Sequence, residues 1–76
     1  MIGEDDDMIK INREHEEPLV LNVSTLKQVH LEGTNFHRCF LNELDFCGSI
    51  LTNIDFRSAE MNNAKFVSVS FIRSRL

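Results

Sequence analysis

The stretch "TNFHRCFLNELDFCGSILTNIDF", residues 34–56, carries a large apolar residue at every fifth position. A helix face repeats about every 3.6 residues and a strand face every 2, so neither element explains a period of five. The same register continues on both sides of the stretch and contains only Leu, Phe and Met. Its members are Leu21, Leu26, Leu31, Phe36, Leu41, Phe46, Leu51, Phe56, Met61, Phe66, Phe71 and Leu76. The register therefore indicates that the chain is built from internal repeats of five residues.

A second register lies two residues before the first, and most of its members are small and none is charged. They are Leu19, Ser24, Val29, Thr34, Cys39, Leu44, Ser49, Ile54, Ala59, Ala64, Val69 and Ser74. Two inward-facing positions that lie two residues apart predict a short extended segment, which forms one side of a coil. The Asn, Asp and Ser residues between them favour turns, because their side chains bond nearby backbone groups. Equal sides with regular corners predict a coil, and successive coils stack through backbone hydrogen bonds.

This pattern resembles the pentapeptide-repeat family, whose unit is a small residue, then Asp or Asn, then Leu or Phe, then two mostly polar residues. The segments "LDFCG", "IDFRS" and "AKFVS" fit it closely or nearly so, whereas Leu19, Leu44 and Ile54 are large where the family prefers small residues. The resemblance covers roughly residues 19–76. It implies an all-β fold, a right-handed quadrilateral β-helix (a pentapeptide-repeat solenoid) with four units per coil and so about three coils.

The first 17 residues break the period and divide the chain into an acidic N-terminal segment, 1–17, and a solenoid, 18–76. Seven of the twelve acids lie in the first part, which carries a net charge of −5 against +1 for the remainder. Pro18 marks the junction and is expected to interrupt either element. Within the segment, Ile9 and Ile11 alternate with polar residues, which predicts a strand that covers the open first coil.

Length and composition exclude several classes of protein. A chain of 76 residues forms one small domain with a limited core. It has neither an apolar run long enough to cross a membrane nor a signal peptide, so we expect a soluble, intracellular protein. That the cell is a bacterial host, with the protein in its cytoplasm, is implied only by the resemblance to other proteins. Two cysteines make no disulfide framework. The net charge of −4 argues against direct binding of nucleic acid.

Residues suited to catalysis or metal binding are few. The three histidines do not form a metal-ligand spacing with Cys39 or Cys47, and no nucleotide-binding loop or hydrolase motif is present. Cys39 lies on an inward register and is expected in the core, whereas Cys47 faces outward. We therefore expect no enzyme, no cofactor and no metal.

The acidic residues have two interpretations. A charge run is commonly a solvated tail, but it also suits a basic partner. The family resemblance adds that long pentapeptide-repeat proteins include rod-shaped mimics of duplex DNA that bind topoisomerases, and the small size resembles phage-encoded inhibitors such as anti-CRISPR proteins. It implies a DNA mimic that inhibits a CRISPR surveillance complex or a topoisomerase by occupying its DNA-binding groove. The expected partner-binding residues are Asp5, Asp6, Asp7, Glu14, Glu16, Glu17, Glu43, Asp45 and Glu60.

The alternative is a generic interaction or structural module that recognises protein by shape. Outward positions carry Val20, Phe40, Ile50, Val67 and Ile72, and stepping by twenty residues places Phe40 between Val20 and Glu60. The last coil has no cap, which predicts a homodimer through that coil, unless the chain is a fragment. The same stepping gathers basic residues on another side, around Asp55: His37, Arg38, Arg57 and Arg75.

Overall fold

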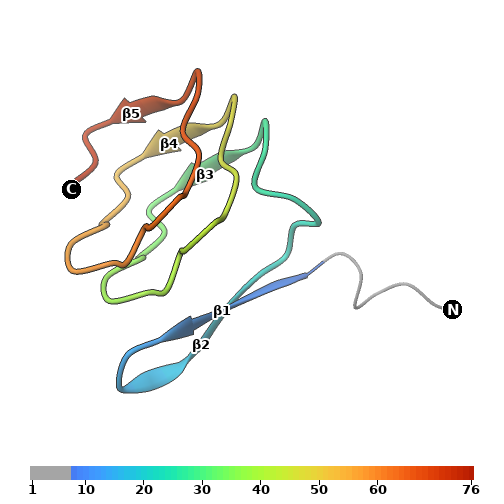
Figure 1. Cartoon of the computed structure of the whole chain (residues 1–76). Helices are drawn as coiled ribbons and strands as arrows, with labels where there is room; N and C mark the ends of the chain where they lie inside the picture. The colour runs from blue at the N-terminus through green and yellow to red at the C-terminus, as the bar shows by residue number, and fades with distance from the viewer. Residues whose placement is uncertain (1–7) are drawn as a thin grey trace, which may run out of the picture.

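The computed structural model describes residues 8–76, which form five strands. These are β1 (Ile9–Arg13), β2 (Glu16–Leu21), β3 (His30–Glu32), β4 (Ile50–Thr52) and β5 (Ser70–Ile72). β1 and β2 form an antiparallel hairpin, and β3, β4 and β5 form a parallel sheet. In this sheet each residue pairs with the residue twenty positions later, so that His30 pairs with Ile50 and Ile50 with Ser70. Figure 1 shows the three strands side by side on successive turns of the chain.

The offset of twenty residues also holds outside the strands. Isolated parallel bridges join Asn35 to Asp55 and Asp45 to Lys65. The ladder begins where the Gln28 amide donates to the Cys47 carbonyl, at 3.0 Å, and runs to the last units of the chain. The fold is thus all-β and β-helix-like, as predicted, but the stack has about two and a half coils, because it begins near residue 28 and not at residue 19.

The hairpin takes up the residues expected in the first units. Leu21 pairs with Ile9 of β1 and not with a residue of a later coil. Pro18 lies inside β2, where Glu17 and Pro18 together oppose Asn12 of β1 at a register shift. Such a bulge leaves a residue without a ladder bond, so it tolerates proline. The expectation that Pro18 interrupts both elements was wrong for this reason.

β1 also bonds to the first coil through its second edge. The Phe40 amide donates to the Asn12 carbonyl at 2.9 Å, and the Glu14 amide donates to the Arg38 carbonyl at 3.0 Å. Ile11 is only 3% exposed and belongs to the core, so a strand is present at the predicted residues Ile9 and Ile11 and packs against the first coil. β1 therefore lies beside Phe40, in the place where stepping by twenty residues had put Val20. Val20 instead pairs with Lys10 in the hairpin, because the chain leaves the five-residue path there.

The corners of the coils share one backbone conformation. A positive φ recurs at every fifth residue, two positions after each member of the large apolar register from Leu26 to Phe71: Gln28, Gly33, Arg38, Glu43, Gly48, Asn53, Ser58, Asn63, Ser68 and Arg73. Only two of these are glycine, so most corners hold a side chain in a region that L-residues rarely adopt. At alternate corners a side-chain oxygen helps to hold the turn. The carboxylate of Asp55 and the amide oxygen of Asn35 each accept from the amide two residues later, as the composition predicted.

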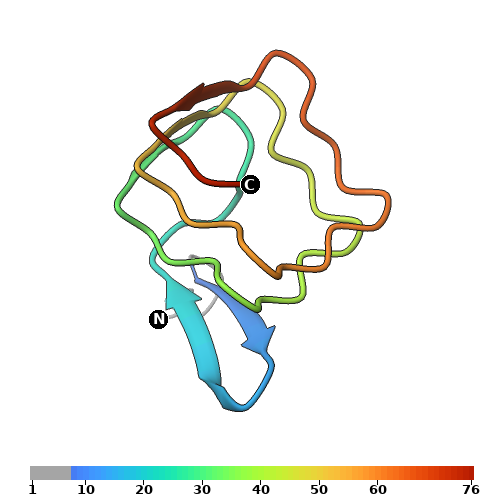
Figure 2. The same ribbon diagram turned by 90° about the vertical axis from the view of Figure 1, so that its left-hand side faces the viewer.

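The core is a column of the large register residues. Phe36 and Phe46 are fully buried, and the rings of Phe46 and Phe66 stack with centroids 5.1 Å apart. Phe56 is 1% exposed and packs against four other rings. Burial decreases toward the last coil, where Phe71 is 40% exposed. Figure 2 shows the successive turns of the backbone nearly superposed around a common interior.

Serine hydroxyls are inserted into two corners. Elsewhere a corner is closed directly, as where the Cys39 amide donates to the Phe36 carbonyl at 3.0 Å. At the corner before β3, the hydroxyl of Ser49, from the next coil, donates to the Leu26 carbonyl and accepts from the Val29 amide at 3.1 Å. Ser49 is 1% exposed, yet its hydroxyl is satisfied in both roles. Ser74 does the same one coil later, donating to the Leu51 carbonyl and accepting from the Ile54 amide.

Candidate functional site

Four exposed glutamates lie along one connected strip of backbone, which we call the acidic flank: Glu14, Glu16, Glu17 and Glu60. The first three belong to the β1–β2 hairpin. β1 bonds to the segment around Phe40, and Phe40 forms a parallel bridge with Glu60. The strip thus runs across four neighbouring backbone segments, in the order β2, β1, the segment around Phe40 and the segment around Glu60. At a strand spacing of about 4.8 Å, β2 and Glu60 lie about 14 Å apart.

Local contacts offset part of the charge of the flank. Glu16 forms an ion pair with Arg13, with 3.4 Å between Oε1 and Nη1. A carboxylate oxygen of Glu14 lies 3.6 Å from Nε2 of His15. Glu60 accepts a 3.3 Å hydrogen bond from the amide of Asn42. The glutamate side of each contact is exposed, so each contact is weak and the carboxylates stay available to a partner.

The other predicted acidic residues lie elsewhere. Glu43 is exposed at the corner that ends the side containing Phe40, with a φ of 65°. Asp45 is half-buried and accepts from the amide of Cys47 at 2.9 Å. Hydrogen bonding to Cys47 lowers the pKa of Asp45 and raises the pKa of the Cys47 thiol. Asp45 is thus part of a corner. The predicted residues Asp5, Asp6 and Asp7 lie outside the described part of the chain.

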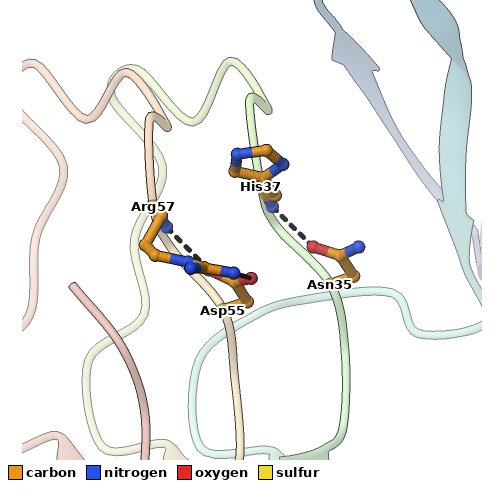
Figure 3. A network of polar contacts seen from close by, with 4 residues as sticks. All are labelled: Asn35, His37, Asp55 and Arg57. Carbon is orange, nitrogen blue, oxygen red and sulfur yellow. Dashed lines mark hydrogen bonds and ion pairs between the residues drawn. The ribbon is translucent and has the colours of Figure 1, made fainter.

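The basic side is organised around one ion pair, which Figure 3 shows. Arg57 donates from Nη2 to Oδ2 of Asp55 at 2.8 Å and from Nε to Oδ1 at 3.0 Å. These bonds hold the pKa of Asp55 well below its usual range and raise the pKa of Arg57. One coil earlier, Asn35 and His37 form the same turn without the ion pair. The nearby His37 side chain lowers the pKa of Asp55 further.

Beside this ion pair lies a cavity of about 260 Å³, the arginine pocket, lined by Asn53, Ile54, Asp55, Arg73 and Arg75. Within residues 8–76, neither Arg73 nor Arg75 has a carboxylate within 4.0 Å. Arg75 was predicted to lie on this side of the stack, whereas Arg73 was not. Stepping by twenty from Asn53 would have found it, because the Asn53 amide donates to the Ile72 carbonyl beside Arg73.

The pKa of the thiol is raised in both cysteines. Cys39 is fully buried, and burial raises the pKa of its thiol. In the part of the chain that the structure describes, no group of three or more His, Cys, Asp or Glu residues is arranged to hold a metal ion. Nor does any helix among residues 8–76 have the length and apolar character needed to cross a membrane.

Twenty-residue coils stack here in a β-helix-like arrangement of five-residue units, with an inward Leu, Phe or Met at every fifth position and a left-handed corner after each side. A family model of pentapeptide repeats matches the chain with eight copies, over residues 21–53 and 41–76. The chain belongs to the pentapeptide-repeat family. The comparisons with curated proteins and with solved structures each found no significant match.

Proposed function

We propose that this repeat module is a non-enzymatic inhibitor that presents the acidic flank to the DNA-binding groove of a basic bacterial protein or complex, acting in the cytoplasm. The observation that carries the proposal is a pair of backbone hydrogen bonds between the β1–β2 hairpin and the first coil: the Phe40 amide donates to the Asn12 carbonyl, and the Glu14 amide donates to the Arg38 carbonyl. They join the hairpin acids to the solenoid, so that these acids are not a loose tail.

The physical basis is electrostatic competition. The affinity of proteins for DNA depends strongly on contacts with phosphate charges, and a rigid array of carboxylates competes for the same basic groove. A preorganised array loses less conformational entropy on binding than a flexible tail. The right-handed, four-sided coil of the family would supply that rigidity. Glu43 and the run Asp5–Asp7 would extend the array. A CRISPR surveillance complex and a topoisomerase are both partners of the required chemistry.

The basic side restricts how the protein can dock. Arg57, Arg73 and Arg75 lie in the later coils, whereas three of the four flank residues lie in the hairpin. A basic groove would attract the acidic flank and repel the arginines. The charge distribution therefore favours one orientation in the groove.

The test is capture from bacterial lysate with wild-type protein and with the triple variant Glu14→Gln, Glu16→Gln, Glu17→Gln, read by mass spectrometry with and without excess duplex DNA. Capture of a DNA-handling complex that is lost in the triple variant and displaced by DNA would support the proposal. Glu17→Gln has a matched control in Glu32→Gln, an exposed glutamate of β3 outside the flank. Equal losses of the captured complex in these two single variants would count against mimicry. So would capture that excess duplex DNA does not reduce.

The alternative, recognition by shape, is favoured by exposed apolar side chains. Ile50 of β4 and Ile72 of β5 are both 42% exposed on neighbouring strands of the parallel sheet. Neighbouring exposed apolar residues can mark an interface. Binding through them would persist at high salt and would be lost in Ile50→Ser with Ile72→Ser.

A further inference from the structure

The arginine pocket is the strongest unassigned feature, because its positive charge is not balanced within the described chain. Asp55, the acidic residue that lines it, already accepts two hydrogen bonds from the side chain of Arg57. Arg57 therefore offsets Asp55, and Arg73 and Arg75 remain as two net positive charges beside the cavity. Its volume of about 260 Å³ is large enough for one or two carboxylate groups with their water.

The backbone keeps the two arginines in place. The Arg75 amide donates to the Ile54 carbonyl at 2.8 Å, and the Phe56 amide donates to the Arg75 carbonyl at 2.7 Å. Arg73 occupies a corner with a φ of 50°. Two guanidinium groups on a fixed backbone suit the planar, bidentate recognition of carboxylates.

We propose that this pocket binds the acidic run Glu4–Asp7 of a second copy of the chain, so that copies associate head to tail. The run has four consecutive acids and is the longest in the sequence, whereas residues 66–76 contain Arg73 and Arg75 and no acid. Each chain thus carries complementary charges at the two ends of its sequence. Figure 1 shows β1 beginning on the opposite side of the stack from β5, which favours a contact between copies over one within a chain.

The proposed contact is heterologous, since it joins two different surfaces. It differs in this respect from a homodimer through two identical C-terminal coils. A heterologous contact that does not close into a ring continues from copy to copy, so the average mass should rise with protein concentration and not stop at a dimer. Exposed ion pairs are individually weak and screened by salt, so association should be strongest at high protein and low salt concentration.

The decisive experiment is complementation between two variants, followed by light scattering and analytical ultracentrifugation. The pocket variant, Arg73→Gln with Arg75→Gln, keeps the acidic run. The run variant, Asp5→Asn with Asp6→Asn and Asp7→Asn, keeps the pocket. We expect each variant alone to be monomeric and their mixture to form heterodimers, because one copy supplies the run and the other supplies the pocket. Arg38→Gln, which removes a positive charge outside the pocket, is the control and should associate as the wild type does.

A peptide of residues 1–7 should bind the run variant in a fluorescence titration, and its affinity should fall at least about tenfold between about 50 mM and 500 mM NaCl. Three results would overturn the inference: monomers at every wild-type concentration, association unchanged in both variants, or pocket-dependent binding of a short DNA duplex without binding of the peptide. The first would exclude contact between copies. The second would assign association to another surface, and the third would assign the pocket to phosphate. All variants should first show wild-type circular dichroism.

Discussion

Replacing Ser49 by alanine tests how two of the corners are closed. The hydroxyl bridges the Leu26 carbonyl and the Val29 amide, and the side chain is 1% exposed. Its removal leaves a donor and an acceptor without that partner. Each unsatisfied buried group costs about 1–3 kcal/mol, and partial closure into a direct turn bond recovers some of this, so we expect a loss of about 2–3 kcal/mol. For a domain of this size that corresponds to a fall in Tm of about 10–20 °C.

The measurement is urea unfolding followed by circular dichroism, with thermal melts alongside. Ser24→Ala is the matched control, since Ser24 lies on the same five-residue register but is exposed and precedes the ladder. Ser74→Ala should fall between the two, because its bridge is only partly buried. If Ser49→Ala lowers the free energy of unfolding no more than Ser24→Ala does, the inserted hydroxyl does not stabilise the fold and the bridging argument fails.

Three further outcomes are expected. Phe56→Ala should lower the free energy of unfolding by about 3–5 kcal/mol, because it opens a cavity among four rings, and a small change in the urea midpoint would contradict the packing described. Gly48→Ala should destabilise more than Gly33→Ala in the same assay. Both have positive φ, but only at Gly48 would the new Cβ meet a glutamine side chain, at 3.0 Å, so equal losses would show that this contact is unimportant. Arg57→Gln should raise the pKa of Asp55 in an NMR titration. Because the folded pKa of Asp55 is lowered, its ion pair stabilises the wild type above the ordinary Asp pKa of about 3.9, and this small contribution should be lost as the pH falls below that value.

The five-residue period predicted the core because that period follows from side-chain burial, whereas the stacking offset of twenty residues was implied by the family resemblance, which gives four units per coil. Phe36 and Leu41 are fully buried, as expected, and Cys39 lies inside with them. The start of the stack could not be predicted in the same way. Leu19 and Leu21 fit the registers, but pairing with β1 competes for the same residues and buries Ile11 as well. A one-dimensional pattern does not show which of two compatible partners a strand will take.

The charged surfaces could be predicted only in part. Pairing of residues twenty apart brought Asp55 and Arg75 to one side, as expected. The arrangement of the flank was not predictable, because it depends on an antiparallel contact between β1 and the segment around Phe40 that has no counterpart in the repeat. The positive φ at the corners could not be predicted from residue type either, since residues as different as Arg38 and Asn63 adopt it. Their shared position in the coil imposes this conformation more than their own preference does.

The regular recurrence of the left-handed corner bears on how such a chain can change in length. Removing one residue from a side would shift every later corner onto a neighbouring position and would turn the inward Phe and Leu residues toward water. Removing twenty consecutive residues within the stack would delete one full turn and rejoin corner to corner, with all remaining partners in register. Length variation should therefore be tolerated in whole turns and selected against in single residues, so that the stack grows or shrinks in steps of about 4.8 Å.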